Sequence, residues 1–420
     1  MFAECTTLDN GLRVVSKKIE SFGSIALEVA IDAGSALEDN TNNGVAHFVE
    51  HMLFKGTKTR TAKDIACFFD NIGGAFNAFT DRDLTVYHVK VLPNDLDSSM
   101  EVLADIIQNS TFDEKELELE RGVILQEIAE CHDEPSDIIF DKYYENIYSN
   151  QYYGRPILGT VNTVKKMTRD DLINFVNRYY VSSNIVITVV GDIEHSNAIS
   201  YVKKHFINIK KDSVQSKYLP IQYKIADFRE ERDLQQVHLL LGFEGMNQYD
   251  KDRYSLGILS SILGSGMSSR LFQEVREKRG LVYGISSFSS NSIATGEFGI
   301  YASLTPDNVA EYLDVVSSEL KKMNVVFQEE MTRVKNRLKA TLAMKQDSNV
   351  FFARYISNMQ MRYNEIKSID EVIEKYNAVT IDDLYESLEI LLSKSFSFAA
   401  VGKLDTIPSY NEIKNKFIIN

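Results

Sequence analysis

Short apolar runs alternate along the chain with longer segments whose apolar positions recur at the period of a helix. Strand-like runs lie at residues 24–35, 84–92 and 298–304, and amphipathic helical segments lie at 95–110 and 309–323. Several strand-like runs follow one another without a helix between them, which is typical of antiparallel pairing. The pattern therefore predicts an α+β fold, with mostly antiparallel sheets covered by helices.

The two halves of the chain repeat the same order of elements. TRDDL at 168–172 precedes the apolar run NIVITVVGDIEH, and TIDDL at 380–384 precedes SFSFAAVGKLD, so the two copies lie 211 or 212 residues apart. A helix, a turn, an apolar strand that ends in Gly and a further helix recur in this order, and such a repeat indicates a duplicated domain.

The stretch between the two copies is polar and contains Pro220, as is typical of a linker. We therefore expect two homologous α/β domains. The first spans residues 1–206, the linker spans 207–224, and the second domain spans 225–420.

Composition limits the classes of partner. The chain has 420 residues, enough for more than one hydrophobic core, and a net charge of −14, which argues against nucleic acid because phosphates require a basic face. Cys5, Cys67 and Cys131 are widely spaced without a CxxC pair, a pattern typical of free thiols in a reducing compartment. No apolar run approaches 18 residues, and the first residues lack a basic and then apolar leader. We therefore expect a cytoplasmic protein that does not span a membrane.

The segment NGVAHFVEHMLFKGTKTR (43–60) places His47, Glu50 and His51 on an otherwise apolar helix. Residues i and i+4 of a helix lie on one face, so both imidazoles can reach one ion, and Glu50 shares that face. The H-x-x-E-H order is the inverse of the H-E-x-x-H zinc motif, in which the Glu is the general base. A catalytic zinc has three protein ligands and one open position, so the third ligand must come from another element.

A carboxylate from residues 114–148 is the candidate for that third ligand. Glu120 and Glu127 are seven residues apart, two helical turns, on one stripe whose neighbours Val123 and Ile124 are apolar. A carboxylate on a largely buried stripe requires a nearby cation. The spacing alone leaves both glutamates as candidates.

Together these residues resemble the pitrilysin-like zinc peptidases, and specifically the branch of short chains that includes the mitochondrial processing peptidase and its bacterial relatives. The resemblance runs essentially end to end, through NGLRVV, AGSALED, GVAHFVEHMLFKGT, IGGAFNAFTDRDLTVYHVKV, ERGVILQEI, GRPILGT and SSRLFQEVREKRGLVYGISSF. It implies one zinc ion per chain bound by His47, His51 and Glu127. It also implies Glu50 as general base and Glu120 as a nearby acid that supports the site.

The second copy of the repeat lacks the metal ligands. An offset of 211 residues places Ile258, Ser261 and Ile262 where the H-x-x-E-H motif would fall, and none of these side chains is a usual zinc ligand. We therefore expect the domain at 1–206 to be the catalytic, zinc-binding one. The domain at 225–420 is expected to be its partner without a metal motif.

The resemblance extends to a strand that would bind substrate. Asn77 and Ala78, in the segment IGGAFNAFT (72–80), would contact a peptide backbone along an exposed edge strand. An interior strand with a bulge at Gly73–Gly74 is the alternative interpretation of the same residues.

Four further residues are expected to contact the substrate. The resemblance implies that Tyr283 donates to the scissile carbonyl and that Arg276 holds the substrate. In the mitochondrial relatives, acids at the offsets of Asp137 and Asp141 hold an arginine just upstream of the cut, so we expect a preference for basic residues near the cleavage site. A solvated helix face is the alternative interpretation of the two aspartates.

The leading hypothesis is a zinc-dependent endopeptidase that cleaves peptides or unfolded segments in an enclosed, clamshell-type chamber, with metal-activated water and Glu50 as general base. Long family members enclose the peptide with four domains, whereas this chain supplies two. We therefore expect a homodimer, in which Arg276 and Tyr283 of one chain complete the zinc site of the other. The alternatives are a non-catalytic assembly or core subunit of the same fold and a protease that matures one peptide precursor.

Overall fold

The computed structural model describes residues 2–212, 214 and 218–417, which form two compact units. The first unit consists of Met1–Ala129, Arg155–Tyr218 and Ala343–Ser368, and the second of Glu130–Gly154, Leu219–Leu342 and Ile369–Asn420. Each unit contains one sheet and its covering helices, so each has a hydrophobic core of its own.

The sheet of the first unit has six strands in the order β1-β2-β6-β3-β5-β4. All neighbours pair antiparallel except β2 and β6, which are parallel. The bounds are β1 (Glu4–Thr7), β2 (Arg13–Lys18), β3 (Ile25–Ile31), β4 (Ala75–Thr80), β5 (Thr85–Val91) and β6 (Ile185–Gly191). Since β4 ends the order, it is an edge strand, and the alternative of an interior strand after Gly73–Gly74 is wrong.

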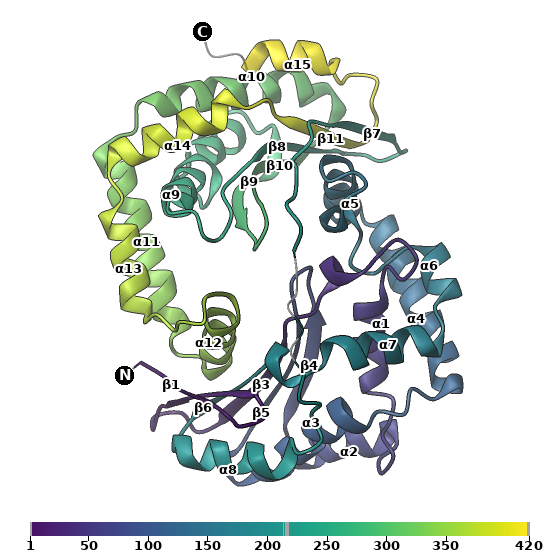
Figure 1. Ribbon diagram of the computed structural model, residues 1–420. Coiled ribbons are helices and arrows are strands. Elements are labelled where there is room, and N and C mark those ends of the chain that lie inside the picture. The colour runs from purple at the N-terminus through teal and green to yellow at the C-terminus, as the bar shows by residue number, and fades with distance from the viewer. Residues whose placement is uncertain (1, 213, 215–217, 418–420) are drawn as a thin grey trace. The chain divides into compact units, whose positions relative to one another are not determined.

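Helices cover both faces of this sheet. Helices α3 and α8 lie side by side along it, and α3 packs on β3 and β5 (Figure 1). The helices of the first unit are α1 (Val45–Leu53), α2 (Ala62–Ile72), α3 (Leu96–Asn109), α4 (Glu114–Asp133), α6 (Val161–Lys166), α7 (Arg169–Tyr179), α8 (His195–His205) and α12 (Asn349–Tyr363). Helix α4 belongs to this unit as far as Ala129, and its last residues belong to the second unit.

The second unit repeats this plan. Its five-stranded sheet has the order β7-β11-β8-β10-β9, in which β7 and β11 are parallel and the other pairs antiparallel. The strands are β7 (Asp227–Glu231), β8 (Val237–Glu244), β9 (Val282–Asn291), β10 (Gly296–Leu304) and β11 (Ser397–Gly402). The helices are α5 (Pro135–Ile147), α9 (Arg253–Gly264), the π-helix η5 (Phe272–Glu277), α10 (Val309–Lys321), α11 (Gln328–Lys345, up to Leu342), α13 (Ile369–Ala378), α14 (Ile381–Ser393) and α15 (Tyr410–Phe417). The expected α+β architecture of two homologous, mostly antiparallel domains is confirmed.

The two units exchange one helix in each direction. Helix α5 comes from the first half of the sequence and packs on β8 and β11 of the second unit, whereas α12 comes from the second half and packs on β3 and β6 of the first. The compact units are therefore not continuous in sequence. The expected domain boundaries, 1–206 and 225–420, stay a prediction.

The expected linker, 207–224, includes residues 213 and 215–217, which lie outside the described residues. Its described part contains no helix or strand. No helix within the described ranges is long and apolar enough to cross a membrane.

Helix α12 is anchored to the first sheet by a buried ion pair. Glu28 on β3 is fully buried, and Arg354 on α12 donates to its carboxylate at 3.0 Å. Ser357 on α12 also donates to the Thr188 hydroxyl on β6, at 2.8 Å. A buried carboxylate without a cation costs several kcal/mol, in the range of about 3–5 kcal/mol. The exchanged helix is therefore needed to satisfy a charge inside the first unit.

Candidate metal centre

Helix α1 begins against a buried carboxylate. Glu38 accepts hydrogen bonds from the backbone N–H groups of Gly44 (2.8 Å) and Ala46 (2.9 Å) and from the side-chain amide of Asn43 (2.8 Å). The first N–H groups of a helix have no partner within the helix, and its N-terminus carries a partial positive charge. The Glu38 carboxylate accepts from these N–H groups and lies at the positive end of the helix. The hydrogen bonds lower the pKa of its carboxyl group, but burial outweighs them and raises this pKa to about 7.

Gly44 fixes the entry into α1. It precedes the first helical residue with φ of 96°, in the left-handed region that favours glycine, and a Cβ there would meet the backbone oxygen of Leu158 at 2.8 Å. Only glycine fits this close approach without strain. Gly44 thereby fixes where α1 starts. The start of the helix in turn sets the direction in which each of its side chains points.

The two faces of α1 have different environments. The face that packs into the core consists of Val45, Ala46, Phe48, Val49, Met52 and Leu53, all buried. His47, Glu50 and His51 lie between these positions and keep partial solvent access. The apolar face therefore orients the three polar side chains together to one side.

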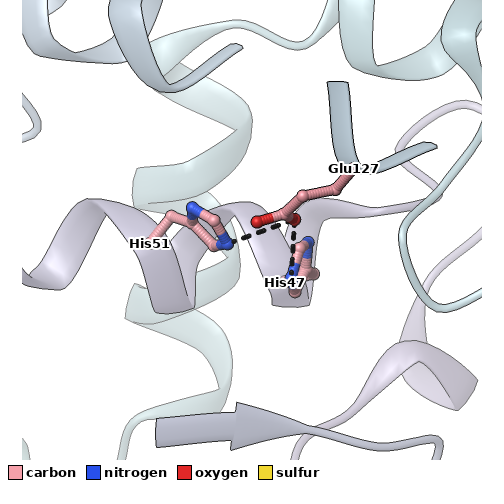
Figure 2. Close-up of side chains that lie close together, drawn as sticks. All are labelled: His47, His51 and Glu127. Carbon is pink, nitrogen blue, oxygen red and sulfur yellow. Dashed lines mark ion pairs between the residues drawn. The ribbon is translucent and has the colours of Figure 1, made fainter. Parts of the chain in front are cut away.

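The structure brings His47, His51 and Glu127 together. Glu127 is on α4, and its carboxylate lies between the two imidazole rings (Figure 2). The distance from Glu127 Oε2 to Nε2 is 3.6 Å for both histidines, and one ligand atom from each residue lies within 4.8 Å of the others. Two atoms that each bind a tetrahedral zinc at about 2.0–2.1 Å are about 3.3–3.5 Å apart. The cluster therefore has the donor set of a zinc site, and each histidine lies close to the distance from Glu127 that a shared zinc ion requires.

His47 is held in the form that binds metals. Burial lowers the pKa of its imidazole to about 3, and the neighbouring His51 contributes in the same direction. The ring is therefore neutral at physiological pH, with an electron pair available for a metal.

Glu120 fixes the ring of His51. Its carboxylate, only 6% exposed, accepts from His51 Nδ1 at 3.0 Å and from Lys55 Nζ at 2.6 Å. A carboxylate that accepts this hydrogen bond places the ring proton on Nδ1, and Nε2 is the ring nitrogen that faces Glu127. Glu120 thus contacts the ring nitrogen of His51 that faces away from Glu127, where an acid that supports the site is expected.

Glu50 is adjacent to the cluster and partly buried. Burial raises the pKa of its carboxyl group, and a hydrogen bond from the Thr80 hydroxyl, 2.5 Å from Glu50 Oε2, opposes that shift. A carboxylate that binds a proton more readily than usual is suited to general-base chemistry.

Three contacts to the site were absent from the sequence-based expectations, namely those of Glu38, Lys55 and Thr80. Lys55 lies four residues after His51, so helical spacing could have indicated it. Glu38 and Thr80 reach α1 from other elements, and their spacing in sequence carries no comparable signal.

Asn77 and Ala78 lie on the edge strand β4. The side-chain oxygen of Asn77 accepts from the backbone N–H of Ala78 at 2.8 Å, and the Asn77 side chain is exposed. A peptide that paired with this edge could take over that N–H.

The other expected substrate residues lie in the second unit. Arg276 is on η5 and Tyr283 on β9, with the guanidinium carbon 5.3 Å from the centre of the Tyr283 ring, a cation–π contact. Tyr283 is 83% exposed. Asp137 and Asp141 are on α5; Asp137 is exposed, and Asp141 accepts from the Cys131 thiol at 3.7 Å.

The position in the second unit that repeats the motif has no metal ligand. Ile258 and Ile262 are buried on α9, with Ser261 between them. Across the described part of the chain, the group of side chains that could hold a metal is the one formed by His47, His51 and Glu127.

Comparison with known proteins finds matches along most of the chain. Residues 13–161 match the family model described as insulinase (peptidase family M16), and residues 166–338 match the M16 inactive domain. An uncharacterized zinc protease of Rickettsia felis is 37% identical over 400 residues, which cover 95% of this chain and 97% of the relative. The β subunit of the mitochondrial processing peptidase of Bos taurus is 33% identical over 423 residues, 97% of this chain and 86% of the relative.

Solved structures have the same fold. The crystal structure of a peptidase M16 inactive domain from Pseudomonas fluorescens superimposes with a TM-score of 0.89, covering 96% of this chain and 98% of that one at 21% sequence identity. Relatives named as zinc proteases support a metallopeptidase role for this chain.

We expect substitution of any one candidate ligand to remove the metal. The wild-type chain should hold about one zinc ion, and His47→Ala, His51→Ala and Glu127→Ala should each lose most of it, because each removes one of three protein ligands. Zinc per chain is measured by elemental analysis after gel filtration. His132→Ala is the matched control, since this exposed histidine is on the same helix as Glu127. Full zinc occupancy in Glu127→Ala would rule out this residue as the third ligand.

Proposed function

The chain belongs to the insulinase (M16) family of peptidases, and on that premise we propose that it is a zinc-dependent endopeptidase that cleaves peptides or unfolded segments. The convergence of His47, His51 and Glu127 carries the proposal, since their ligand atoms lie within 4.8 Å of one another beside Glu50. When bound there, zinc supplies a Lewis acid that polarises a carbonyl and lowers the pKa of water to about 7.

The proposed general base is Glu50. Its carboxylate removes a proton from the attacking water as the oxygen bonds to the scissile carbonyl carbon, and it then gives that proton to the leaving nitrogen as the C–N bond breaks. The raised pKa of Glu50 favours the first of these transfers, because its carboxylate binds a proton more readily than an ordinary glutamate. Glu120 keeps His51 in the tautomer that a metal requires, through the bond to Nδ1.

The edge strand β4 is the proposed binding surface for the substrate backbone. A peptide that adds to β4 would form main-chain hydrogen bonds at Asn77 and Ala78, and the Ala78 N–H would exchange its bond to the Asn77 side chain for one to the peptide. Main-chain bonding of this kind selects an extended chain rather than a folded surface. We also propose that cleavage takes place in an enclosed chamber of clamshell type. The proposed location of the protein is the cytoplasm.

Tyr283 and Arg276 are proposed to contact the reacting peptide. A phenol O–H directed at the developing oxyanion stabilises the transition state, and a guanidinium can hold a substrate carbonyl. The exposed ring of Tyr283 and the adjacent Arg276 are consistent with a shared role.

Replacement of Glu50 should separate metal binding from chemistry. Glu50→Gln keeps the shape of the side chain but removes the base, so we expect zinc to stay bound while turnover of a quenched-fluorescent peptide falls by about 10²–10⁴-fold. Glu114→Gln, an exposed glutamate in the first turn of α4, is the control and should remain active. Near-normal turnover by Glu50→Gln would mean that another group is the base. A wild-type protein that holds zinc but cleaves no peptide would instead favour a non-catalytic assembly subunit.

A preference for basic residues is expected from the acids on α5. Asp137 and Asp141 are one helical turn apart in a chain of net charge −14, and paired carboxylates bind arginine well. In the variant Asp137→Asn/Asp141→Asn, the ratio of kcat/KM for an Arg-containing peptide to that for an Arg-free peptide should fall. Asp133→Asn, an exposed acid at the end of α4, controls for the loss of negative charge. An unchanged ratio would leave the two aspartates as a solvated helix face.

We propose a homodimer with two composite sites, each with the zinc cluster and Glu50 from one chain and Arg276 and Tyr283 from the other. Glu50→Gln and Tyr283→Phe should each be nearly inactive alone. When they are co-expressed, a mixed dimer contains one site with both residues intact, so activity should return to at most about a quarter of wild type if chains pair randomly and sites act independently. Co-expression of two differently tagged Glu50→Gln chains is the control. No recovery in the mixture, or a monomer by sedimentation, would contradict this assembly.

A further inference from the structure

We propose that Thr80 is a positioning residue for Glu50 and that it links the edge strand β4 to the general base. This inference rests on the proposed function of Glu50. Thr80 is the last residue of β4, two residues beyond Ala78, and its side chain points to the same side of the strand as that of Ala78. The strand proposed to hold the substrate thus also carries the group that contacts the base.

The contact between Thr80 and Glu50 is short and specific. Thr80 Oγ1 donates to Glu50 Oε2 at 2.5 Å. Among the residues that the structure describes, no other group donates a hydrogen bond to the Glu50 carboxylate. A bond from a hydroxyl to a carboxylate is of the strong, charge-assisted kind. One oxygen of Glu50 is therefore fixed, and the other stays available for a proton.

The Thr80 hydroxyl has a second possible acceptor across the hairpin. Thr80 pairs with Thr85 on β5, and their hydroxyl oxygens are 3.3 Å apart. Thr85 is fully buried, and it donates its one hydroxyl proton to the backbone oxygen of Ala33 at 2.8 Å. Thr85 can thus only accept from Thr80. The closer and charged acceptor, Glu50, is the stronger partner for the Thr80 proton.

This arrangement couples substrate binding to the orientation of the base. A glutamate side chain rotates about several bonds, and misplacement of a reacting group by about 1 Å can cost about 10²-fold in rate. A peptide paired with β4 at Ala78 would hold the strand, and through it Thr80, in one position. The base would then be oriented when substrate is present, with no new contact to the metal ligands.

The test compares Thr80→Val, which keeps the shape and removes the hydroxyl, with Thr80→Ser, which keeps the hydroxyl. We expect Thr80→Val to lower kcat for a quenched-fluorescent Arg-containing peptide by about 10- to 100-fold, with KM and zinc content close to wild type. Thr80→Ser should recover most of the lost kcat. Thr6→Val is the matched control, since Thr6 lies on β1 at the opposite edge of the same sheet and its hydroxyl bonds to His195.

A double variant tests whether Thr80 acts through Glu50. In the Glu50→Gln background, Thr80→Val should cause little further loss of kcat, because the group that it positions is already absent. Thr80→Ala serves as a second hydroxyl-free variant if Thr80→Val folds poorly, as judged by thermal unfolding.

Several results would overturn the proposal: wild-type kcat in the hydroxyl-free variants, equal impairment of Thr80→Ser and Thr80→Val, loss of zinc on removal of the hydroxyl, or a full additional loss in the double variant. If the wild-type chain itself cleaves no peptide, the proposed function fails. If the wild type is active and Thr80→Val matches it, only the role of Thr80 fails.

Discussion

The candidate site depends on the burial of one face of α1. Six apolar side chains hold that face in the core, and Gly44 and Glu38 fix where the helix starts, so the helix has little freedom to rotate. His47, Glu50 and His51 are then directed to one side by the helical period alone. If the apolar face were loosened, the distances between the imidazoles and Glu127 on the neighbouring helix would change together. The geometry of the site is therefore a property of the core as much as of its polar residues.

Two buried carboxylates in the first unit are each paired with a specific cation. Glu120 lies between His51 and Lys55, and Glu28 is paired with Arg354 on the exchanged helix α12. A buried carboxylate is costly unless it is paired and hydrogen-bonded, so these partners restrict which conformations are stable. Glu120 also orients the ring of His51, so this one contact pairs a buried charge and positions a candidate ligand.

The sequence was sufficient for the parts of the structure that follow from local periodicity. The i, i+4 spacing of His47 and His51 places them on one face of α1, and the alternation of residues 75–80 predicts a strand. The repeat of elements predicted two similar domains, and the structure has two sheets with the same mixture of pairings. The choice between Glu120 and Glu127 required either a resemblance or coordinates, because both lie on one stripe of α4.

Long-range contacts could not be predicted in this way. The exchange packs α5 and α12 on strands far from them in the sequence, and the sequence of neither helix indicates which sheet it covers. The contacts of Thr80 with Glu50 and of Glu38 with the start of α1 likewise depend on how strands and loops pack around the helix. The contact of Lys55 with Glu120 was easier to foresee, because Lys55 lies one helical turn after His51, which Glu120 also contacts. Such contacts are set by tertiary packing, so a single sequence carries little trace of them.

The position of a bound zinc ion decides whether His47, His51 and Glu127 form the metal site. Anomalous diffraction at the zinc absorption edge from crystals of the full chain locates the metal without reference to activity. We predict one peak per chain, about 2.0–2.2 Å from Nε2 of His47, Nε2 of His51 and a carboxylate oxygen of Glu127. A peak at another set of side chains, or one bonded to Glu120 in place of Glu127, would contradict this prediction.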